Sequence, residues 1–331
     1  MKQIKFSKST LGAAIAGVSL IAASSAFAAP TTIPMTSIAD SWHNLGSGNT
    51  KDGTPNLTGA IPNHSADTAE VCVFCHTPHG GDNTAAVPIW NRVLSDPAQY
   101  TRYSDLGTST FDATEAPIGS VTIACLSCHD GTNAIDNVIN APGSGGFNAA
   151  GAQIGTGFTG DDQVAGKLAP GIVQNLGTDL SNDHPVSMQY AGGGISVAAP
   201  DGPTNDIDFV AGNNPKAHPK NYVLSNELAP ANGLISTMWW IERGVDSVTG
   251  ELSLSAGRDR EDIILYTRIE TANGLNSVEQ PFVECGSCHD PHNIENPTFL
   301  RVSNGVPADS TAGFPTANGS PSGLCLSCHI K

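Results

Sequence analysis

The sequence is poor in basic residues. Its 331 residues include 15 lysines and arginines against 31 aspartates and glutamates, and the formal net charge at pH 7 is −16. A surface with this excess of negative charge repels nucleic acids and anionic lipids, and it favours cationic partners, metal ions and mineral surfaces. We therefore expect no nucleic-acid-binding function.

Long apolar runs are missing after the N-terminus, so no membrane span is expected there. Residues 11–23 form a short apolar run that follows three lysines and precedes a small-x-small sequence, Ala-Phe-Ala, at residues 26–28. This order is typical of a secretory signal peptide, which we assign to residues 1–28. No cysteine stands near the predicted cleavage site, so a lipid anchor is not expected. The sequence predicts an exported protein.

Cysteine occurs nowhere outside four copies of one motif, Cys-x-x-Cys-His. Motifs 1 to 4 span residues 72–76, 125–129, 285–289 and 325–329. Two thiols three positions apart can each add to a vinyl group of one haem, while the adjoining imidazole binds its iron. A zinc site would need no histidine at that fixed position, and a disulfide framework rarely spaces every cysteine alike. The sequence therefore predicts four covalently bound haem c groups.

The four motifs assign two sets of residues. The predicted thioether bonds are made by Cys72, Cys75, Cys125, Cys128, Cys285, Cys288, Cys325 and Cys328, and the predicted proximal iron ligands are His76, His129, His289 and His329.

The predicted mature chain has too few methionines to supply a second ligand to each of four haem irons. Only three methionines follow the predicted signal peptide, whereas six histidines lie outside the motifs: His43, His64, His79, His184, His218 and His292. We therefore expect a second histidine on each iron. Such a six-coordinate centre has a low potential compared with a histidine–methionine centre, and it passes electrons without binding substrate.

Motifs 1 and 3 each continue to a further histidine. They read Cys-His-Thr-Pro-His, ending at His79, and Cys-His-Asp-Pro-His, ending at His292. A histidine three residues beyond the proximal one cannot reach round to the far face of the same haem. His79 and His292 must therefore serve a different haem or none. If each serves the next haem of its own pair, the pair is held together by an exchange of ligands.

The spacing of the motifs divides the predicted mature chain into three parts. Residues 29–140 carry motifs 1 and 2, residues 141–280 carry no cysteine, and residues 281–331 carry motifs 3 and 4. With 36 glycines and 22 prolines, the chain is richer in both than an average globular protein. Residues 237–242 and 263–269 predict short strands, and residues 88–94 predict one or two helical turns. We expect a mostly irregular, loop-rich multihaem fold with few short helices and strands and a core formed largely by stacked haems.

Seven short segments of the sequence resemble one group of proteins. They are His43-Asn-Leu, Cys72-Val-Phe-Cys-His-Thr-Pro-His, Pro88-Ile-Trp-Asn-Arg, Cys125-Leu-Ser-Cys-His-Asp-Gly-Thr, Asp183-His-Pro-Val-Ser, Cys285-Gly-Ser-Cys-His-Asp-Pro-His and Cys325-Leu-Ser-Cys-His. Together they resemble the multihaem cytochromes with doubled Cys-x-x-Cys-His motifs found in metal-respiring bacteria. They are most similar to the extracellular tetrahaem cytochromes that polymerise into conductive filaments.

This resemblance implies the distal ligands and the partners. It makes His43, His79, His184 and His292 the distal iron ligands and leaves His64 and His218 as the reserves, with His64 as the first of them. It implies a head-to-tail homopolymer in which a histidine of one copy, His43 or His64, ligates a haem of the next. Only two residues follow His329, so we expect the haem of motif 4 at a subunit face. The location implied is the cell surface or the extracellular space, with the periplasm as the alternative.

Three functions remain open from the sequence. The first is an electron conduit between outer-surface redox proteins and extracellular acceptors such as metal oxides. The second is a monomeric periplasmic shuttle, and the third is a multihaem reductase with one open haem. The lysine-ligated Cys-x-x-Cys-Lys variant of nitrite reductases is absent, so we expect an electron-transfer protein and no enzyme. The acidic stretch 201–208 predicts either a calcium site or solvated surface.

Overall fold

The computed structural model describes most of the chain between residues 38 and 329. The described residues are 38–47, 63–65, 67–109, 111, 113–142, 158–196, 199, 203–209, 223–228, 237–242, 262–271, 275, 278–293, 296–302 and 323–329. They all belong to one unit, Thr36–Lys331. The predicted signal peptide and His218 lie outside the described residues. Within the described part, no helix is long and apolar enough to cross a membrane.

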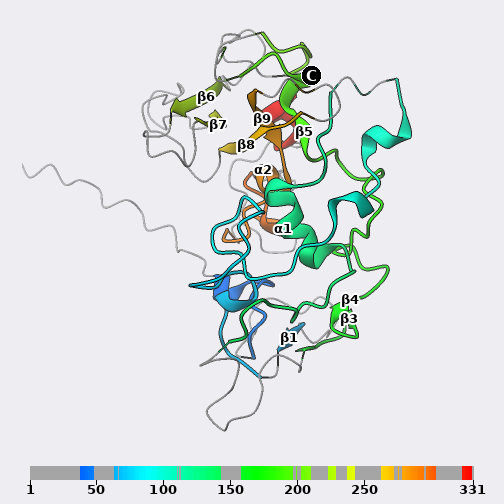
Figure 1. The fold of residues 1–331 in the computed structure, drawn as a ribbon, viewed down its shortest axis with the longest axis vertical. Coiled ribbons are helices and arrows are strands. Elements are labelled where there is room, and N and C mark those ends of the chain that lie inside the picture. Colours follow the sequence, from blue (N-terminus) through cyan, green and yellow to red (C-terminus); the bar gives the residue numbers. More distant parts are fainter. Residues whose placement is uncertain are drawn as a thin grey trace, which may run out of the picture. The chain divides into compact units, whose positions relative to one another are not determined.

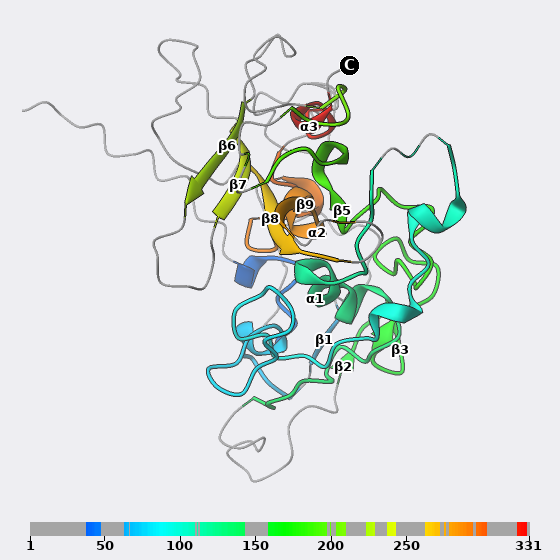
Figure 2. The ribbon, with the colours of Figure 1, turned by 45° about the horizontal axis from the view of Figure 1, so that its top comes forward.

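The α-helices of the described chain coincide with cysteine motifs, whereas short 3₁₀ helices also occur at Ile38–Asp40, Pro97–Gln99, Tyr103–Leu106, Tyr190–Gly192 and Pro297–Phe299. Helix α1 is Ser120–His129, α2 is Cys285–Cys288 and α3 is Cys325–Cys328, while motif 1 forms a 3₁₀ turn at Cys72–Phe74 (Figures 1 and 2). In motifs 1, 3 and 4 the amide of the histidine donates to the carbonyl of the first cysteine over 2.8–3.0 Å. This bond closes one helical turn. The turn brings the two thiols and the imidazole of each motif close together.

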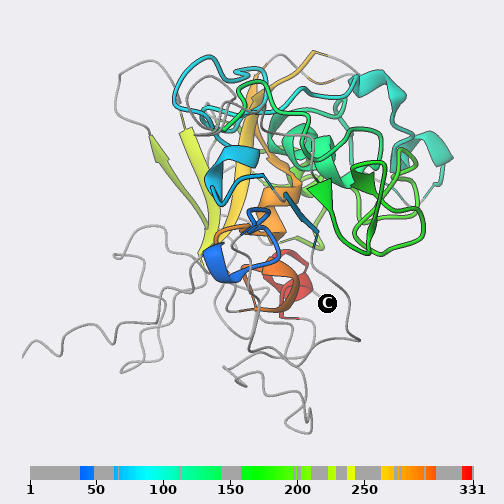
Figure 3. The ribbon, with the colours of Figure 1, turned by 90° about the horizontal axis from the view of Figure 1, so that it is seen from below.

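A five-stranded antiparallel sheet occupies much of the predicted haem-free segment. Its strands are β5 (Met188–Gln189), β6 (Val223–Leu228), β7 (Thr237–Glu242), β8 (Ile263–Ile269) and β9 (Glu279–Val283), arranged in the order β5-β9-β8-β7-β6. Strands β7 and β8 lie side by side in every view (Figures 1, 2 and 3). Both strands confirm the sequence prediction at residues 237–242 and 263–269. Their β-branched and aromatic residues suit a half-buried pleated surface.

Two further strand pairs contain only two residues in each strand. Strand β1 (His64–Ser65) pairs with β2 (Phe158–Thr159), and β3 (Gln163–Val164) pairs with β4 (Lys167–Leu168), both antiparallel. With its short helices and short strands, the described chain has the loop-rich fold that its glycine and proline content predicts.

The helical turns predicted at residues 88–94 are wrong. Ile89 has a positive φ of 49°, and Trp90 and Arg92 form isolated bridges with distant residues. The turn at Ile89 directs the carbonyl of Pro88 towards His76, from which it accepts a hydrogen bond of 2.9 Å. This tertiary bond therefore replaces the local bonds of a helix.

Buried apolar side chains form several small clusters instead of one core. The largest lies at the sheet around Trp239, Ile241 and Leu265, and Cys328 packs against it. A second surrounds α1, and Cys75 packs against that cluster. The apolar interior of the chain therefore borders on motif cysteines in both places.

We predict that the cluster at the sheet makes a large contribution to stability. Trp239 is completely buried, so Trp239→Ala should lower the free energy of unfolding by about 3–5 kcal/mol. Trp239→Phe should cost much less, because it keeps most of the apolar volume and removes an indole N–H that has no acceptor among the described residues. Ile269→Ala is the control, because its side chain is 66% exposed. Thermal unfolding followed by circular dichroism measures the difference, and equal effects of Trp239→Ala and Ile269→Ala would contradict the prediction.

Candidate metal centres

Backbone carbonyls hold the proximal imidazoles of three motifs. The Nδ1 atoms of His76, His129 and His289 lie 2.9, 2.8 and 2.7 Å from the carbonyl oxygens of Pro88, Gln174 and Thr298. A bond of this kind makes Nδ1 the protonated nitrogen, fixes the orientation of the ring and leaves the lone pair of Nε2 for a metal. The three imidazoles are thus arranged as metal ligands of fixed tautomer.

Three proximal histidines each have a second imidazole at close range. The ring centroids of His76 and His292 are 6.2 Å apart, those of His129 and His43 are also 6.2 Å apart, and those of His329 and His184 are 6.5 Å apart. Two imidazole nitrogens about 2.0 Å from one metal ion put the ring centres roughly 6 Å apart. The donor sets at motifs 1, 2 and 4 therefore fit an iron bound on both faces by histidine.

The predicted ligands differ in how the structure places them. Three of the four predicted distal histidines, His43, His184 and His292, lie opposite a proximal histidine, whereas His79 does not. The ring of His79 is exposed, and among the described residues no ring lies opposite it or opposite the proximal His289. The reserve His64 lies in β1. Ligation of iron by all these residues stays a prediction.

The histidine that follows motif 3 does not remain within the C-terminal pair. His292 lies opposite His76 of motif 1, so the position of its ring favours the centre of motif 1 over the other haem of its own pair. His43 lies opposite His129 of its own chain, and its role as a ligand between copies stays a prediction. Sequence spacing could not reveal either pairing, because both depend on contacts between distant segments.

The loop that follows motif 3 contributes to the centres of motifs 1 and 2, as well as to motif 3 through the Thr298 carbonyl. We call residues 289–293 and 296–300 the motif-3 loop. It supplies His292 opposite His76, and its Pro291 carbonyl accepts a hydrogen bond from the ring of His43. The ring of Phe299 stacks on His43 at 4.3 Å with an angle of 5° between the planes. No pattern in the sequence predicted that Pro291 and Phe299 contact His43.

The environment of His43 keeps its imidazole neutral. Burial and the nearby His129 lower the pKa of His43 to about 4, although the bond to Pro291 acts in the opposite direction. At neutral pH the ring therefore keeps a lone pair for a metal ion, as a ligand must.

The four motifs approach one another in chain order. Burial and the nearby thiol of Cys128 raise the pKa of Cys75 to about 12, so motifs 1 and 2 are close. The thiol of Cys125 donates a hydrogen bond to Cys285, which raises the pKa of Cys125 and lowers that of Cys285. This contact joins motifs 2 and 3. Burial, followed by the thiols of Cys285 and Cys325, raises the pKa of Cys288 to about 11. The effect of Cys325 indicates that motifs 3 and 4 are close.

A buried guanidinium supports the end of motif 2. Arg92 is completely buried, and its donors bind the hydroxyl and carbonyl of Ser127 and the carbonyls of Ala134 and Ile135. No carboxylate of the described chain forms an ion pair with Arg92. Ser127 lies inside motif 2, so this hydrogen-bonded cation fixes the loop after α1 against the motif.

Several exposed apolar side chains flank the imidazoles. Ile89 and Val173 are 52% and 84% exposed and adjoin the residues whose carbonyls hold His76 and His129, and Ile207, 84% exposed, lies two residues before Phe209. The ring of Phe209 is 4.4 Å from that of His329. Apolar side chains beside the ligands suit a large apolar cofactor such as haem.

Other metal sites and disulfides are not present in the described chain. All eight cysteines are free. Among the described residues, no three His, Cys, Asp or Glu side chains form another group that could hold a metal ion. The acidic stretch is described from residue 203 only, and there the Asp206 carboxylate accepts a hydrogen bond from the amide of Asp208.

A comparison with protein families matched the C-terminal part of the chain. Residues 280–331, which carry motifs 3 and 4, match the family described as the doubled CXXCH motif. The match indicates a multihaem c-type cytochrome with haem c attached at the motifs; motifs 1 and 2 lie outside the matched range. A comparison with curated proteins gave no match.

We predict that His292 is the distal ligand at motif 1. His292→Ala should convert one iron from six-coordinate low spin to five-coordinate high spin, because His76 loses the imidazole opposite it. His292→Met is the matched control, since a thioether should keep the iron six-coordinate and raise its potential. Electron paramagnetic resonance and carbon monoxide binding report the change. An unchanged low-spin spectrum in His292→Ala would contradict the assignment.

Proposed function

We propose that the chain is a tetrahaem cytochrome that transfers electrons through bis-histidine iron centres. The observation that carries this proposal is the set of three imidazole pairs with centroids 6.2–6.5 Å apart. Haem c bound at the motifs supplies a one-electron ferric–ferrous couple. With haem bound, the paired histidines would be the two ligands of each iron, so these centres would exchange electrons and would leave no open position for a substrate.

The contacts between motifs support a linear path for electrons. Cys75 of motif 1 packs against the cluster around α1, which contains motif 2. The Thr122 hydroxyl of α1 accepts a hydrogen bond from the amide of Cys285 at the start of motif 3. The thiol of Cys325 in motif 4 contributes to the raised pKa of Cys288 in motif 3. The helices α2 (orange) and α3 (red) also lie near each other in Figures 2 and 3. A chain of centres in this order lets an electron enter at one end and leave at the other.

The unpaired histidine of motif 3 supports assembly into a filament. The imidazole of His289 is exposed, and no ring of the described chain lies opposite it, while the imidazole of His79 is also exposed. We infer that His79 of one copy ligates the iron held by His289 of another. A contact between two different faces repeats from copy to copy and yields an open filament when its rotation does not close into a ring.

The partners and location are proposed from the sequence. The predicted signal peptide at residues 1–28 supports export, and the excess of acidic residues suits cationic or mineral acceptors such as metal oxides, as well as other redox proteins. We propose that the filament acts at the cell surface. The alternative is a monomeric shuttle in the periplasm with the same haem centres.

A reductase is the second candidate, and one observation favours it. If no other residue reaches the iron held by His289, that iron has an open position to which a small substrate can bind. A trans ligand and an open site predict opposite spectra, so the two functions can be separated.

We expect the native protein to contain four haems, all low spin. Mass spectrometry of the exported chain should give the mass of residues 29–331 with four haems, because each motif provides two thiols and one imidazole. Electron paramagnetic resonance should find no high-spin iron, and carbon monoxide should not bind. A high-spin centre that binds carbon monoxide in native assemblies would favour the reductase.

We further expect His79 to be needed for assembly. His79→Ala should keep four haems but should lose filaments in electron micrographs and gain one high-spin iron, because the iron at motif 3 loses its ligand. The control is Asn140→Ala, which removes the amide that binds the His79 carbonyl and leaves the imidazole in place. Wild-type protein that forms only monomers, or His79→Ala protein that still forms low-spin filaments, would overturn this role.

A further inference from the structure

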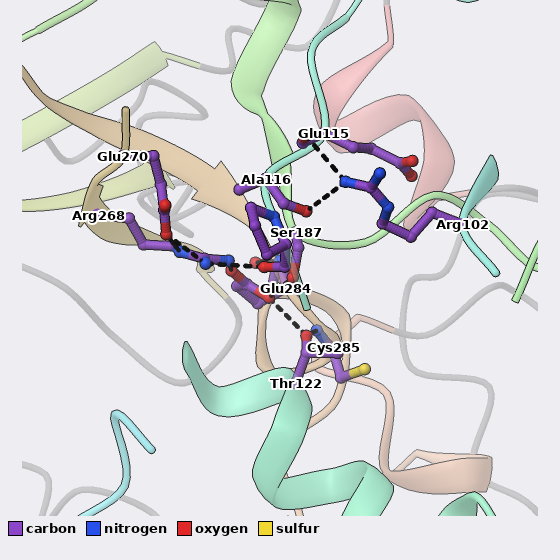
Figure 4. A network of polar contacts seen from close by, with 11 residues as sticks. Arg102, Glu115, Ala116, Thr122, Ser187, Arg268, Glu270, Glu284 and Cys285 are labelled. Carbon is purple, nitrogen blue, oxygen red and sulfur yellow. Dashed lines mark hydrogen bonds and ion pairs between the residues drawn. The ribbon is translucent and has the colours of Figure 1, made fainter. Parts of the chain in front are cut away.

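A carboxylate is completely buried at the start of motif 3. The side chain of Glu284 has no exposed surface, and it accepts hydrogen bonds from the hydroxyls of Thr122 at 2.5 Å and Ser187 at 3.0 Å. Its other oxygen pairs with Nη1 of Arg268 at 2.9 Å. Figure 4 shows these side chains converging on Glu284. Such a charge is costly to bury unless it is paired and hydrogen-bonded, as it is here.

The network joins the two haem motifs that are in direct contact. Thr122 lies in α1, one helical turn before Cys125, and Glu284 immediately precedes Cys285. The Thr122 hydroxyl also accepts a hydrogen bond from the amide of Cys285 at 3.0 Å. One hydroxyl therefore links α1 both to the carboxylate and to the backbone of motif 3. The thiols of Cys125 and Cys285 meet beside it.

The remaining partners of Glu284 come from the sheet. Ser187 immediately precedes β5, Arg268 lies in β8, and Glu284 follows the end of β9. These three strands are neighbours in the order β5-β9-β8, so the pairing of strands that carry no cysteine brings all three side chains to one place. The sheet thereby reaches the contact between motifs 2 and 3.

The network retains an excess of negative charge. Arg268 also binds Glu270 at 2.5 Å and donates to the carbonyl of Pro117 at 2.9 Å, so one cation faces two carboxylates. Burial raises the pKa of Glu284, whereas Arg268 and the hydroxyls of Thr122 and Ser187 act in the opposite direction. A negative charge in a region of low dielectric acts strongly on nearby charges.

We propose that Glu284 is a positioning residue for electron transfer between the centres of motifs 2 and 3. This inference rests on the proposed electron-transfer function. The step moves one electron from a ferrous to a ferric centre and forms no bond, so its rate depends on how closely and in which orientation the two centres are held. Glu284 and Thr122 fix α1 against α2, and the negative charge favours the ferric state on both sides.

The hydroxyl of Thr122 provides the sharpest test. In the haem-loaded full chain, Thr122→Val keeps the shape of the side chain and removes the hydroxyl, while Thr122→Ser keeps it. Thr122→Val should change the Soret circular dichroism, which reports how neighbouring haems are oriented, and should slow intramolecular equilibration after partial reduction. Thr122→Ser should keep the wild-type Soret circular dichroism and the wild-type rate of intramolecular equilibration. The control is Ser120→Ala in the same helix, because the buried Ser120 hydroxyl has no partner in the described chain.

A second variant tests the charge and does not depend on whether Thr122→Val folds. Glu284→Gln keeps the size of the side chain and removes its charge. Loss of the negative charge should favour the ferrous state, with an approximately tenfold shift of the electron-binding equilibrium, about 59 mV for one electron. Spectroelectrochemical titration of the low-spin haems measures this shift.

The outcomes separate this inference from the function on which it rests. Four low-spin haems in the wild type support electron transfer, and if both Thr122→Val and Glu284→Gln then match the wild type in Soret dichroism, equilibration and potentials, the positioning role is overturned. If only two or three haems are attached, or the centres are high spin, the proposed function itself fails. If Thr122→Val does not accumulate, the potentials of Glu284→Gln decide.

Discussion

The hydrogen bond from three of the proximal imidazoles to a backbone carbonyl is the interaction on which the arrangement of their centres depends. His76, His129 and His289 each bind a carbonyl that lies outside their own motif. To present those carbonyls, the loops adopt backbone conformations that a regular helix or strand does not contain. Ile89 beside Pro88 and Thr298 itself both have positive φ values. At Pro88 and Thr298, the irregular backbone therefore allows a carbonyl to hold a proximal imidazole.

The motif-3 loop places the imidazoles, and the sheet places side chains around Glu284. The loop provides His292 for motif 1, the Pro291 carbonyl and the Phe299 ring for His43, and the Thr298 carbonyl for its own His289. The sheet brings Arg268 and Ser187 to Glu284 at the contact of α1 with α2. The segment without cysteine, for which the sequence predicts short strands and one distal histidine, His184, therefore also supports the contact between motifs 2 and 3.

The sequence predictions are correct where local interactions decide the structure. They are wrong or incomplete where contacts between distant residues decide it. Strands β7 and β8 were predicted at their observed bounds, because the β-branched and aromatic pattern that forms them lies within the strands themselves. The helical turns at residues 88–94 were wrong, because Pro88 and Arg92 bind residues far away in the chain. Of the four histidines named as distal ligands, three lie opposite a proximal histidine. The partner of each could not be predicted, since His292 crosses from motif 3 to motif 1 and His43 depends on Pro291 and Phe299.

The sequence by itself determined the chemistry, because covalent attachment and proximal ligation are encoded within five consecutive residues. It predicts four sites for haem c, shows the scarcity of methionine as an alternative ligand and indicates the loop-rich character of the chain. Only the tertiary structure decided which imidazole lies opposite which, that the motifs approach one another in chain order, and that a buried carboxylate lies between two of them. The imidazole pairs and the contacts between motifs join residues that are 37 (Cys288 and Cys325) to 216 (His76 and His292) positions apart. Spacing cannot express the physical reasons for these contacts, which are ring orientation, hydrogen-bond direction and the burial of charge.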